Sequence, residues 1–293
     1  MNIALTVLNI TAPVFLLAAV GFVWVRLGFE YRVAFVTRMA MTLAVPCLIF
    51  VALMRTEIAP EALAALSLAS FVAYALVMAA CFALVKIMRL DVPTYLAPMV
   101  FGNTGNLGLP LALFAFGEVG LGYAVVVFAV MAILSFTIGI WIVSGGGSLK
   151  RLVQEPLVAA TLLGALFLWQ GWETPEFLTN ALDLIGQMAI PLMLITLGVA
   201  VARLEVKAIG RAVFLSVIKV VICVGAAWVA ATYFALDPVA AAVLIVQVAT
   251  PVAVTSYLLA EKYGTDAQPV AGLVVISTLL SVVALPLILA FVI

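Results

Sequence analysis

Long apolar runs follow one another along the whole chain, each bounded by charged or turn-forming residues. We interpret them as ten membrane-spanning helices, because a helix crosses the hydrocarbon core with about 20 predominantly apolar residues. The expected spans are 3–25, 33–54, 62–86, 94–114, 119–143, 154–170, 177–202, 208–234, 238–260 and 268–292. The connections, such as Leu27–Arg32 and Leu236–Pro238, are short and leave no room for an extramembrane domain. The first run has no basic residue before it and is too long for a signal peptide, so we expect it to be the first span.

The composition agrees with this pattern and removes several classes of function. Of 293 residues, 68% are hydrophobic and 9% are charged, whereas soluble domains have about 25% charged residues. A soluble enzyme, a nucleic-acid-binding protein and a disordered chain are therefore excluded. The chain has no histidine, which excludes histidine-bound metals and histidine proton relays. Cys47, Cys81 and Cys223 are far apart and inside apolar runs, so we expect them to be buried hydrophobic residues.

The thirteen basic residues are distributed unevenly between the two ends of the spans. If the N-terminus is outside, eleven of them lie on the cytoplasmic side, only Arg55 lies outside, and Lys219 lies within a span. The cytoplasmic set is Arg26, Arg32, Arg38, Lys86, Arg89, Lys150, Arg151, Arg203, Lys207, Arg211 and Lys262. Short loops with excess lysine and arginine are typical of the cytoplasmic side. The charges therefore predict ten spans with both termini outside.

The two halves of the chain share proline positions. Pro13 corresponds to Pro156 and Pro46 to Pro191, at offsets of 143 and 145 residues. Prolines are frequent in membrane helices, which is the simpler explanation. With five spans per half, related halves would be inverted, as in many secondary transporters. We expect a first repeat at 1–143, a cytoplasmic linker at 144–153 containing Ser144-Gly-Gly-Gly-Ser148, and a second repeat at 154–293.

Two segments interrupt the apolar pattern in equivalent spans of the two halves. Span 4 contains Phe101-Gly-Asn-Thr-Gly-Asn-Leu-Gly-Leu-Pro110, and span 9 contains Gln247-Val-Ala-Thr-Pro-Val-Ala-Val-Thr-Ser256. Glycine and proline disfavour a continuous helix, and irregular backbone persists in a membrane only where it lines a cavity or is buried in protein. We therefore expect broken helices that cross. Their N-terminal ends would suit an anion, while freed carbonyls and the amides of Asn103 and Asn106 would bind a cation or a carboxylate.

The glycines of span 4 have two other interpretations. Glycines at three-residue spacing also allow close helix packing, but Asn103, Thr104 and Asn106 favour a binding site, because buried amides in a membrane need partners. The glycine run is neither a dinucleotide-binding motif nor a P-loop, so no cofactor is expected.

Few other charges lie within the spans. Lys219 is well inside span 8, where its ammonium would either extend to the interface or serve a functional cavity, as a counter-charge to an anion or as a protonation site. Arg38 is expected to be an interfacial anchor, and Glu118 and Asp183 are expected to be solvated near the outer boundary. Intramembrane carboxylates for a proton relay are therefore scarce.

With these motifs, the chain resembles the auxin efflux carrier family in its bacterial form, whose relatives include plant auxin exporters and bacterial malonate and malate permeases. The resemblance rests on ten spans, the central linker, the span 4 motif and Pro191-Leu-Met-Leu-Ile-Thr-Leu-Gly198 in span 7. It implies a fold similar to bile-acid:sodium symporters, with a dimerising scaffold of spans 1, 2, 6 and 7 and a moving transport domain of spans 3–5 and 8–10. It also implies that Asn103 and Asn106 contact a substrate carboxylate and that Pro251 lies at the crossing. The long hydrophilic loop of many plant members is absent here.

The leading hypothesis is a multi-pass carrier of small organic anions in the bacterial plasma membrane, working by elevator-like or rocking alternating access. The candidate binding residues are Asn103, Thr104, Asn106, Lys219, Gln247, Thr250, Pro251 and Ser256. A coupling sodium near Asn103, Gln247 and Thr250, as in sodium-coupled symporters of this fold, and proton coupling both remain open. The alternatives are an anion channel and, least favoured, an intramembrane enzyme, for which no nucleophile with a base is found. The expected partners are the substrate, the lipid bilayer and a second copy of the chain.

Overall fold

The computed structural model of the protein describes residues 3–56, 58–144, 156–204, 206 and 208–293, and this part of the chain is built from helices. Apart from one isolated bridge between Gly102 and Val252, no strand occurs in the described residues. The helices in chain order are α1 (Ile3–Arg26), α2 (Val33–Met39), η1 (Ala40–Ala44), α3 (Val45–Met54), α4 (Pro60–Ile87), α5 (Val92–Val100), η2 (Thr104–Gly108), α6 (Leu109–Leu134), η3 (Ser135–Gly139), α7 (Ile140–Ser144), α9 (Pro156–Gln170), α10 (Glu176–Gln187), α11 (Ala189–Arg203), α12 (Ile209–Tyr233), α13 (Pro238–Val248), α14 (Val254–Tyr263) and α15 (Ala267–Val292).

Seven helical stretches of the described chain are long and apolar enough to cross a membrane. They are Leu5–Arg26, Val33–Met54, Pro60–Ile87, Thr104–Ser144, Glu176–Arg203, Ile209–Tyr233 and Ala267–Val292. Two shorter apolar helices, Pro156–Gln170 and Pro238–Val248, add to these. The protein is thus a helical, multi-pass membrane protein. The expectation of ten spans, of an inverted repeat and of its orientation stays a prediction.

The difference between seven and ten has a local cause. Spans 4 and 9 are interrupted, so α5, α13 and α14 are each too short to be counted as a full span. The third difference is span 6, whose described helix α9 has only 15 residues. The stretch Thr104–Ser144 joins the end of predicted span 4 to span 5, and its helix has a non-helical residue at Gly117, with φ of 65°. The expected linker 144–153 lies outside the described residues except for Ser144.

Helices α5, α13 and α15 each begin directly after a capping aspartate. The carboxylate of Asp91 accepts a hydrogen bond from the Thr94 amide at the start of α5, and Asp237 accepts from the Val239 and Ala240 amides at the start of α13. Asp266 does the same for α15 through the Gln268 amide. A side-chain oxygen at this position satisfies amides that have no partner within the helix. These caps fix the first halves of both broken spans.

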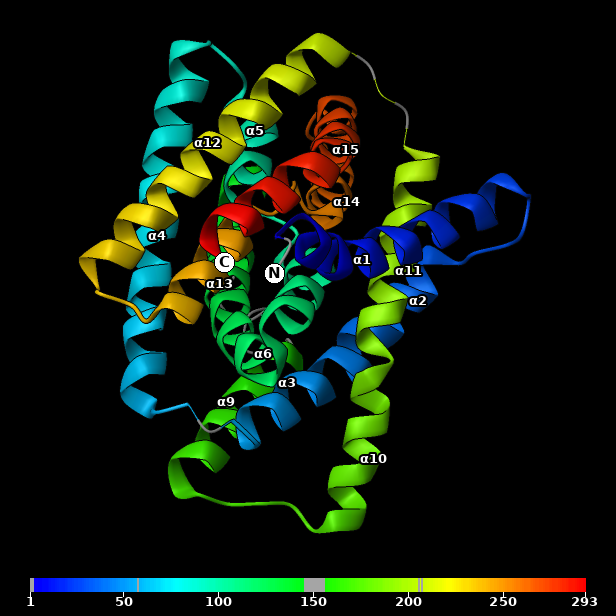
Figure 1. Ribbon diagram of the computed structural model, residues 1–293. Coiled ribbons are helices and arrows are strands. Elements are labelled where there is room, and N and C mark those ends of the chain that lie inside the picture. Colours follow the sequence, from blue (N-terminus) through cyan, green and yellow to red (C-terminus); the bar gives the residue numbers. More distant parts are fainter. Residues whose placement is uncertain (1–2, 57, 145–155, 205, 207) are drawn as a thin grey trace.

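The helices pack in two sets; in Figure 1, α4, α12 and α13 lie on the left and α2, α10 and α11 on the right. In one set α1 packs on α11, and α3 packs on α9 and α10; in the other, α12 packs on α4, α13 and α15, and α6 packs on α13 and α4. A Cβ at Gly198 would lie 1.7 Å from the Ala18 carbonyl oxygen, so only glycine allows α11 to approach α1 this closely. The division resembles the expected scaffold and transport domains, and that assignment stays a prediction.

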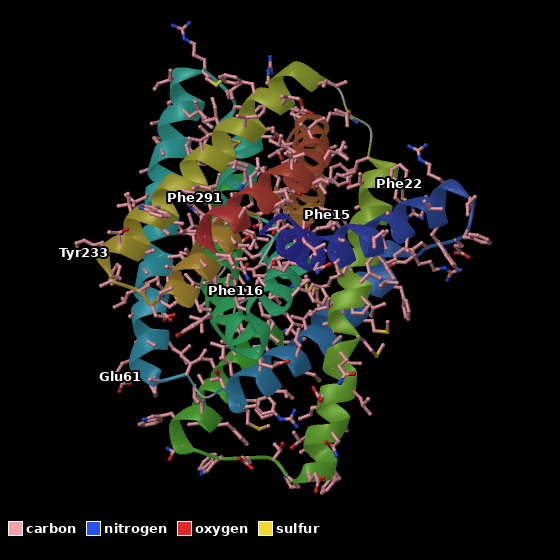
Figure 2. The ribbon with its side chains drawn as sticks, viewed as in Figure 1. Phe15, Phe22, Glu61, Phe116, Tyr233 and Phe291 are labelled. Carbon is pink, nitrogen blue, oxygen red and sulfur yellow. The ribbon has the colours of Figure 1, made fainter. Side chains whose placement is uncertain are left out.

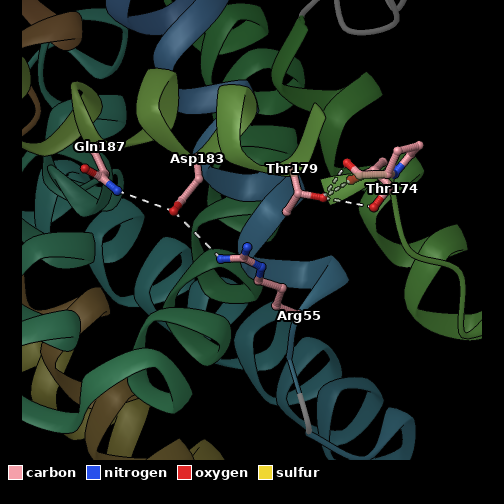
Figure 3. Close-up of polar contacts among 6 residues, drawn as sticks. Arg55, Thr174, Thr179, Asp183 and Gln187 are labelled. Carbon is pink, nitrogen blue, oxygen red and sulfur yellow. Dashed lines mark hydrogen bonds and ion pairs between the residues drawn. The ribbon is translucent and has the colours of Figure 1, made fainter. Parts of the chain in front are cut away.

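Apolar side chains cover the outside of the helices. Tyr233 and Phe291, both labelled in Figure 2, are 80% and 72% exposed at the ends of α12 and α15. Exposed apolar surface of this extent is typical of a lipid-facing protein. Arg55, the one basic residue expected outside, is 3.8 Å from the Asp183 carboxylate, to which Gln187 also donates a hydrogen bond. Both contacts are drawn in Figure 3. As expected, Asp183 and Glu118 are solvent-accessible.

Candidate functional site

The two interrupted spans cross at their breaks. Helix α5 ends at Val100 and η2 begins at Thr104, while α13 ends at Val248 and α14 begins at Val254. Between them the backbones of Gly102 and Val252 form an antiparallel bridge, and the backbone amide of Asn103 donates to the Pro251 carbonyl oxygen at 2.7 Å. Broken helices that cross were expected from the glycines and prolines of these segments, and the described backbone has this arrangement.

The positions of the breaks differ in part from the expectation. Pro251 lies within the break of span 9, as expected. In span 4 the break is at residues 101–103, whereas Pro110 lies just after the point where η2 continues into α6, within the helical stretch Thr104–Ser144. The interruption comes instead from close contact at Gly102, where a Cβ would lie 2.3 Å from the Thr250 hydroxyl oxygen.

Polar side chains complete the hydrogen bonds of the span 9 break. The Val252 amide donates to the Ser277 hydroxyl of α15 at 2.9 Å, and the Thr250 hydroxyl donates to the Gln247 carbonyl oxygen at 2.7 Å. The ammonium of Lys219 donates to the Thr250 carbonyl oxygen at 3.1 Å. Since irregular backbone in a membrane interior needs partners, these bonds explain how the crossing is tolerated.

A cavity of about 360 Å³ lies beside the crossing. Its polar lining residues are Thr37, Asn103, Asn106, Ser135, Thr196, Thr255 and Lys262. Its apolar lining residues are Val33, Ala40, Met41, Phe101, Gly102, Gly105, Phe128, Met131, Ala132, Phe136, Leu157, Met193, Ala253, Val254, Leu258 and Leu259. This volume and this mixture of apolar walls with a few polar groups are typical of small-molecule sites.

The electrostatics of the cavity favour negative charge. Its lining includes residues from the first turns of both second half-helices, Gly105 and Asn106 of η2 and Val254 and Thr255 of α14. Amides in the first turn of a helix have no partner within the helix and carry partial positive charge. Among the lining residues that the structure describes there is no aspartate or glutamate, and Lys262 adds a cation. The site can therefore accept an anionic group at its crossing end.

The amides of Asn103 and Asn106 are the two predicted binding residues that line the cavity. Asn103 is 5% exposed, and its Nδ2 has no hydrogen-bond acceptor among the described residues. Asn106 is more exposed than Asn103. Since an unsatisfied buried donor costs about 1–3 kcal/mol, an acceptor oxygen in the cavity would stabilise this arrangement.

The other predicted residues do not line this cavity. Thr104, Gln247, Thr250 and Lys219 are buried around the crossing, and Pro251 contributes its carbonyl oxygen to Asn103. Ser256 lines a separate, small gap beside Phe101 and Gly139. Their roles as substrate ligands stay predictions, and the geometry gives Thr250, Pro251 and Lys219 contacts within the crossing itself. Lys219, which is 1% exposed, does not extend to the interface.

Several lining residues were missed because their signals are weak in sequence. Thr37, Ser135 and Thr196 are single hydroxyls in apolar runs, and Lys262 stands at the end of a span. The Thr196 hydroxyl is 2.7 Å from the phenol oxygen of Tyr31, and partial burial raises the pKa of Tyr31 above 10.0. Only contact between distant spans gathers these hydroxyls at one cavity.

The predicted sodium position can be compared with the contacts around it. Of the groups proposed as ligands, the Thr250 carbonyl oxygen accepts from Lys219, while the Gln247 side-chain oxygen has no partner among the described residues. No group of three or more aspartate, glutamate or cysteine residues suited to a metal occurs in the described part of the chain. The side chain of Lys219 therefore contacts Thr250 at the position where a sodium ion was left open.

Comparisons with known proteins agree with this architecture. The sequence matches the profile of the family described as "Membrane transport protein" over residues 6–150 and 146–289. It is 26% identical over 199 residues to an uncharacterized transporter of Methanocaldococcus jannaschii, covering 64% of each chain. It is 24% identical over 196 residues to a protein of Rhizobium meliloti named "Putative malonate transporter", covering 62% of this chain and 61% of that protein.

A third relative, an uncharacterized transporter of Methanothermobacter thermautotrophicus, is 29% identical over 192 residues, covering 63% of each chain. The similarity thus extends over somewhat less than two thirds of the length of each of these relatives. The family profile, by contrast, covers nearly the whole of this sequence. The chain therefore belongs to the family described as "Membrane transport protein", the auxin efflux carrier family, and is a multi-pass membrane protein.

Proposed function

We propose that the protein is a secondary carrier of small organic anions, with carboxylates as the substrate class. The observation that carries the proposal is the cavity at the crossing, which brings two helix N-termini and the amides of Asn103 and Asn106 together without a carboxylate among its lining residues. A carboxylate would accept hydrogen bonds from these donors, including the unpartnered Nδ2 of Asn103. The relative named for malonate supports the same class.

Alternating access is the mechanism that we infer for this carrier. Lining residues such as Val33, Leu157 and Lys262 lie near the helix ends that carry the basic residues, so under the proposed orientation the cavity opens toward the cytoplasm. The helix set containing α4–α7 and α12–α15 would move against the set containing α1–α3 and α9–α11, carrying the crossing with it. In inverted-repeat transporters, a binding site near the middle of the membrane commonly opens first to one side and then to the other. We also propose a homodimer that forms through the helix set containing α1–α3 and α9–α11.

Uptake into proteoliposomes tests the substrate class. Labelled malonate and a monocarboxylate such as acetate would be supplied outside vesicles containing the purified protein. We expect saturable uptake that is reduced about tenfold or more by Asn106→Ala, because loss of a hydrogen bond to a charged group is worth about 1.5–3 kcal/mol. Asn180→Ala, at an exposed position of α10, is the matched control and should leave uptake unchanged.

Counterflow distinguishes a carrier from a channel. Vesicles preloaded with unlabelled substrate should accumulate label transiently if the site alternates between the two sides. Flux that neither saturates nor shows counterflow would favour an anion channel. Equal uptake by wild type and Asn106→Ala would contradict the assignment of the site.

A further inference from the structure

The lysine at the centre of α12 is a buried cation without a carboxylate partner. Lys219 is 1% exposed, and the ion pairs found within the described chain, Arg32–Glu30 and Arg55–Asp183, are elsewhere. A charge within a membrane protein is costly unless other groups compensate it, and such residues are usually functional. The surroundings of this ammonium therefore indicate what it does.

The ammonium contacts the crossing just beyond the C-terminal end of α13. Its Nζ is 3.1 Å from the Thr250 carbonyl oxygen, two residues beyond the C-terminal end of α13, and 3.7 Å from the Cys223 sulfur. The C-terminal end of a helix carries partial negative charge, which a cation stabilises. On the neighbouring helix α4, the Cys81 thiol interacts electrostatically with Lys219, whereas Tyr74 interacts with Cys223. No acidic residue from α13 or α15 is paired with Lys219 among the described contacts.

Two other carbonyl oxygens of the break have donors within the described chain. That of Gln247 accepts from the Thr250 hydroxyl, and that of Pro251 accepts from the Asn103 amide. A metal ion at this point would need several free oxygens and would lie close to the ammonium, which would repel it. The crossing thus has a cation supplied by the chain itself.

We propose that the Lys219 ammonium is a built-in cation of the crossing, which replaces a coupling sodium ion and makes transport independent of sodium. This inference rests on the proposed carrier function. The ammonium compensates the negative end of α13, and the positive ends of η2 and α14 remain available to the anion. Lys219 acts through the Thr250 carbonyl and is therefore a positioning residue that does not touch the substrate.

Ion replacement in the proteoliposome assay is the first test. Exchange of sodium for choline at fixed pH and membrane potential should change wild-type carboxylate uptake by less than about twofold, whereas a sodium-coupled carrier would lose about tenfold or more. A loss of that size in the wild type would overturn the inference. The carrier function would still stand in that case, so the two proposals fail separately.

Chemical rescue is the second test. Lys219→Met keeps the length of the side chain but removes its charge, and Lys219→Ala leaves space for a small cation. We expect uptake to fall about tenfold or more in both variants, and ethylammonium to restore the alanine variant at least in part. Ethanol, which is neutral and of similar size, should not restore it. Lys86→Met, at an exposed lysine of α4, is the control for loss of a positive charge.

Thermal stability provides a measurement that does not require a known substrate. The unfolding midpoint of the purified wild type should not change between sodium and choline, and that of Lys219→Ala should rise with ethylammonium but not with ethanol. Lys219→Arg, which keeps the charge, covers the case in which the alanine variant does not fold, and it should also be insensitive to sodium. Wild-type uptake by Lys219→Met, or stabilisation of the wild type by sodium alone, would refute the built-in cation.

Discussion

The hydrogen bond between α15 and the crossing allows a quantitative test of how the irregular backbone is tolerated. In Ser277→Ala the Val252 amide loses the hydroxyl that accepts from it at 2.9 Å. Both residues are buried, Ser277 being 3% exposed and Val252 0%, so water does not replace the acceptor. An unsatisfied buried amide costs about 1–3 kcal/mol, and we expect a loss of stability within this range.

The same helix offers a matched control. Ser281 is also 3% exposed, but its hydroxyl donates to the Thr278 carbonyl oxygen within α15 and accepts from no amide of the crossing. Ser281→Ala removes a hydroxyl that acts only as a donor to a helix carbonyl, and it leaves no amide of the crossing unpaired. The loss of unfolding free energy should therefore be below about 0.5 kcal/mol. Ser277→Thr keeps a hydroxyl and should recover much of the stability lost in the alanine variant.

Unfolding of the purified protein in detergent, followed by intrinsic fluorescence, measures these effects. For a chain of this size, about 1–3 kcal/mol corresponds to a midpoint lower by about 2 to 12 °C. Carboxylate uptake should fall with it if the crossing positions the cavity. Equal midpoints for Ser277→Ala and Ser281→Ala would refute the argument that the Val252 amide depends on α15.

Three other predictions follow from described contacts. Gly108→Ala should cost about 1–3 kcal/mol of stability and lower uptake, because its Cβ would lie 2.0 Å from the Gln247 side-chain oxygen. Gly225→Ala, with open space at its Cβ, is the control, and an equal effect of the two variants would contradict this prediction. A double-mutant cycle of Arg55→Gln and Asp183→Asn should give less than about 1 kcal/mol, because both side chains are exposed, and a larger coupling would contradict it. Burial raises the pKa of Tyr31 above 10.0, so the neutral phenol stabilises the fold. Above pH 10.0 the unfolding midpoint of the wild type should therefore fall more steeply than that of Tyr31→Phe. Parallel pH profiles would be the contrary result.

Local chemistry was sufficient to predict the apolar helices and the broken segments. Gly102, Asn103 and Pro251 disfavour a regular helix wherever they stand, so their place in apolar runs indicated a crossing. The capping aspartates were an overlooked signal. Asp237 lies 146 residues after Asp91, each before a proline and at the start of a broken span, close to the offsets of the other paired prolines.

The details of the site depended on contacts between distant spans, which a single sequence does not contain. Asn106 and Gln247 are both amides beside a break, yet one lines the cavity and the other is buried behind Gly108. The register of each half-helix decides which side of the crossing a residue occupies, and that register follows from helix packing. Likewise, the long stem of Lys219 permits either the interface or the interior, and only the position of α12 against the break leads it to Thr250.

The arrangement of charges at the crossing connects these observations to selectivity. Two helix C-termini, those of α5 and α13, and two N-termini, those of η2 and α14, meet there. Lys219 lies at the negative end of α13, whereas residues from both positive ends line the cavity with Asn103 and Asn106. A cationic ligand in the cavity would therefore meet positive helix ends and amide donors, whereas an anion would satisfy them. This preference is set by the backbone and by one buried lysine. Under the proposed alternating access, it would hold in both orientations of the crossing and would need no acidic residue within the membrane.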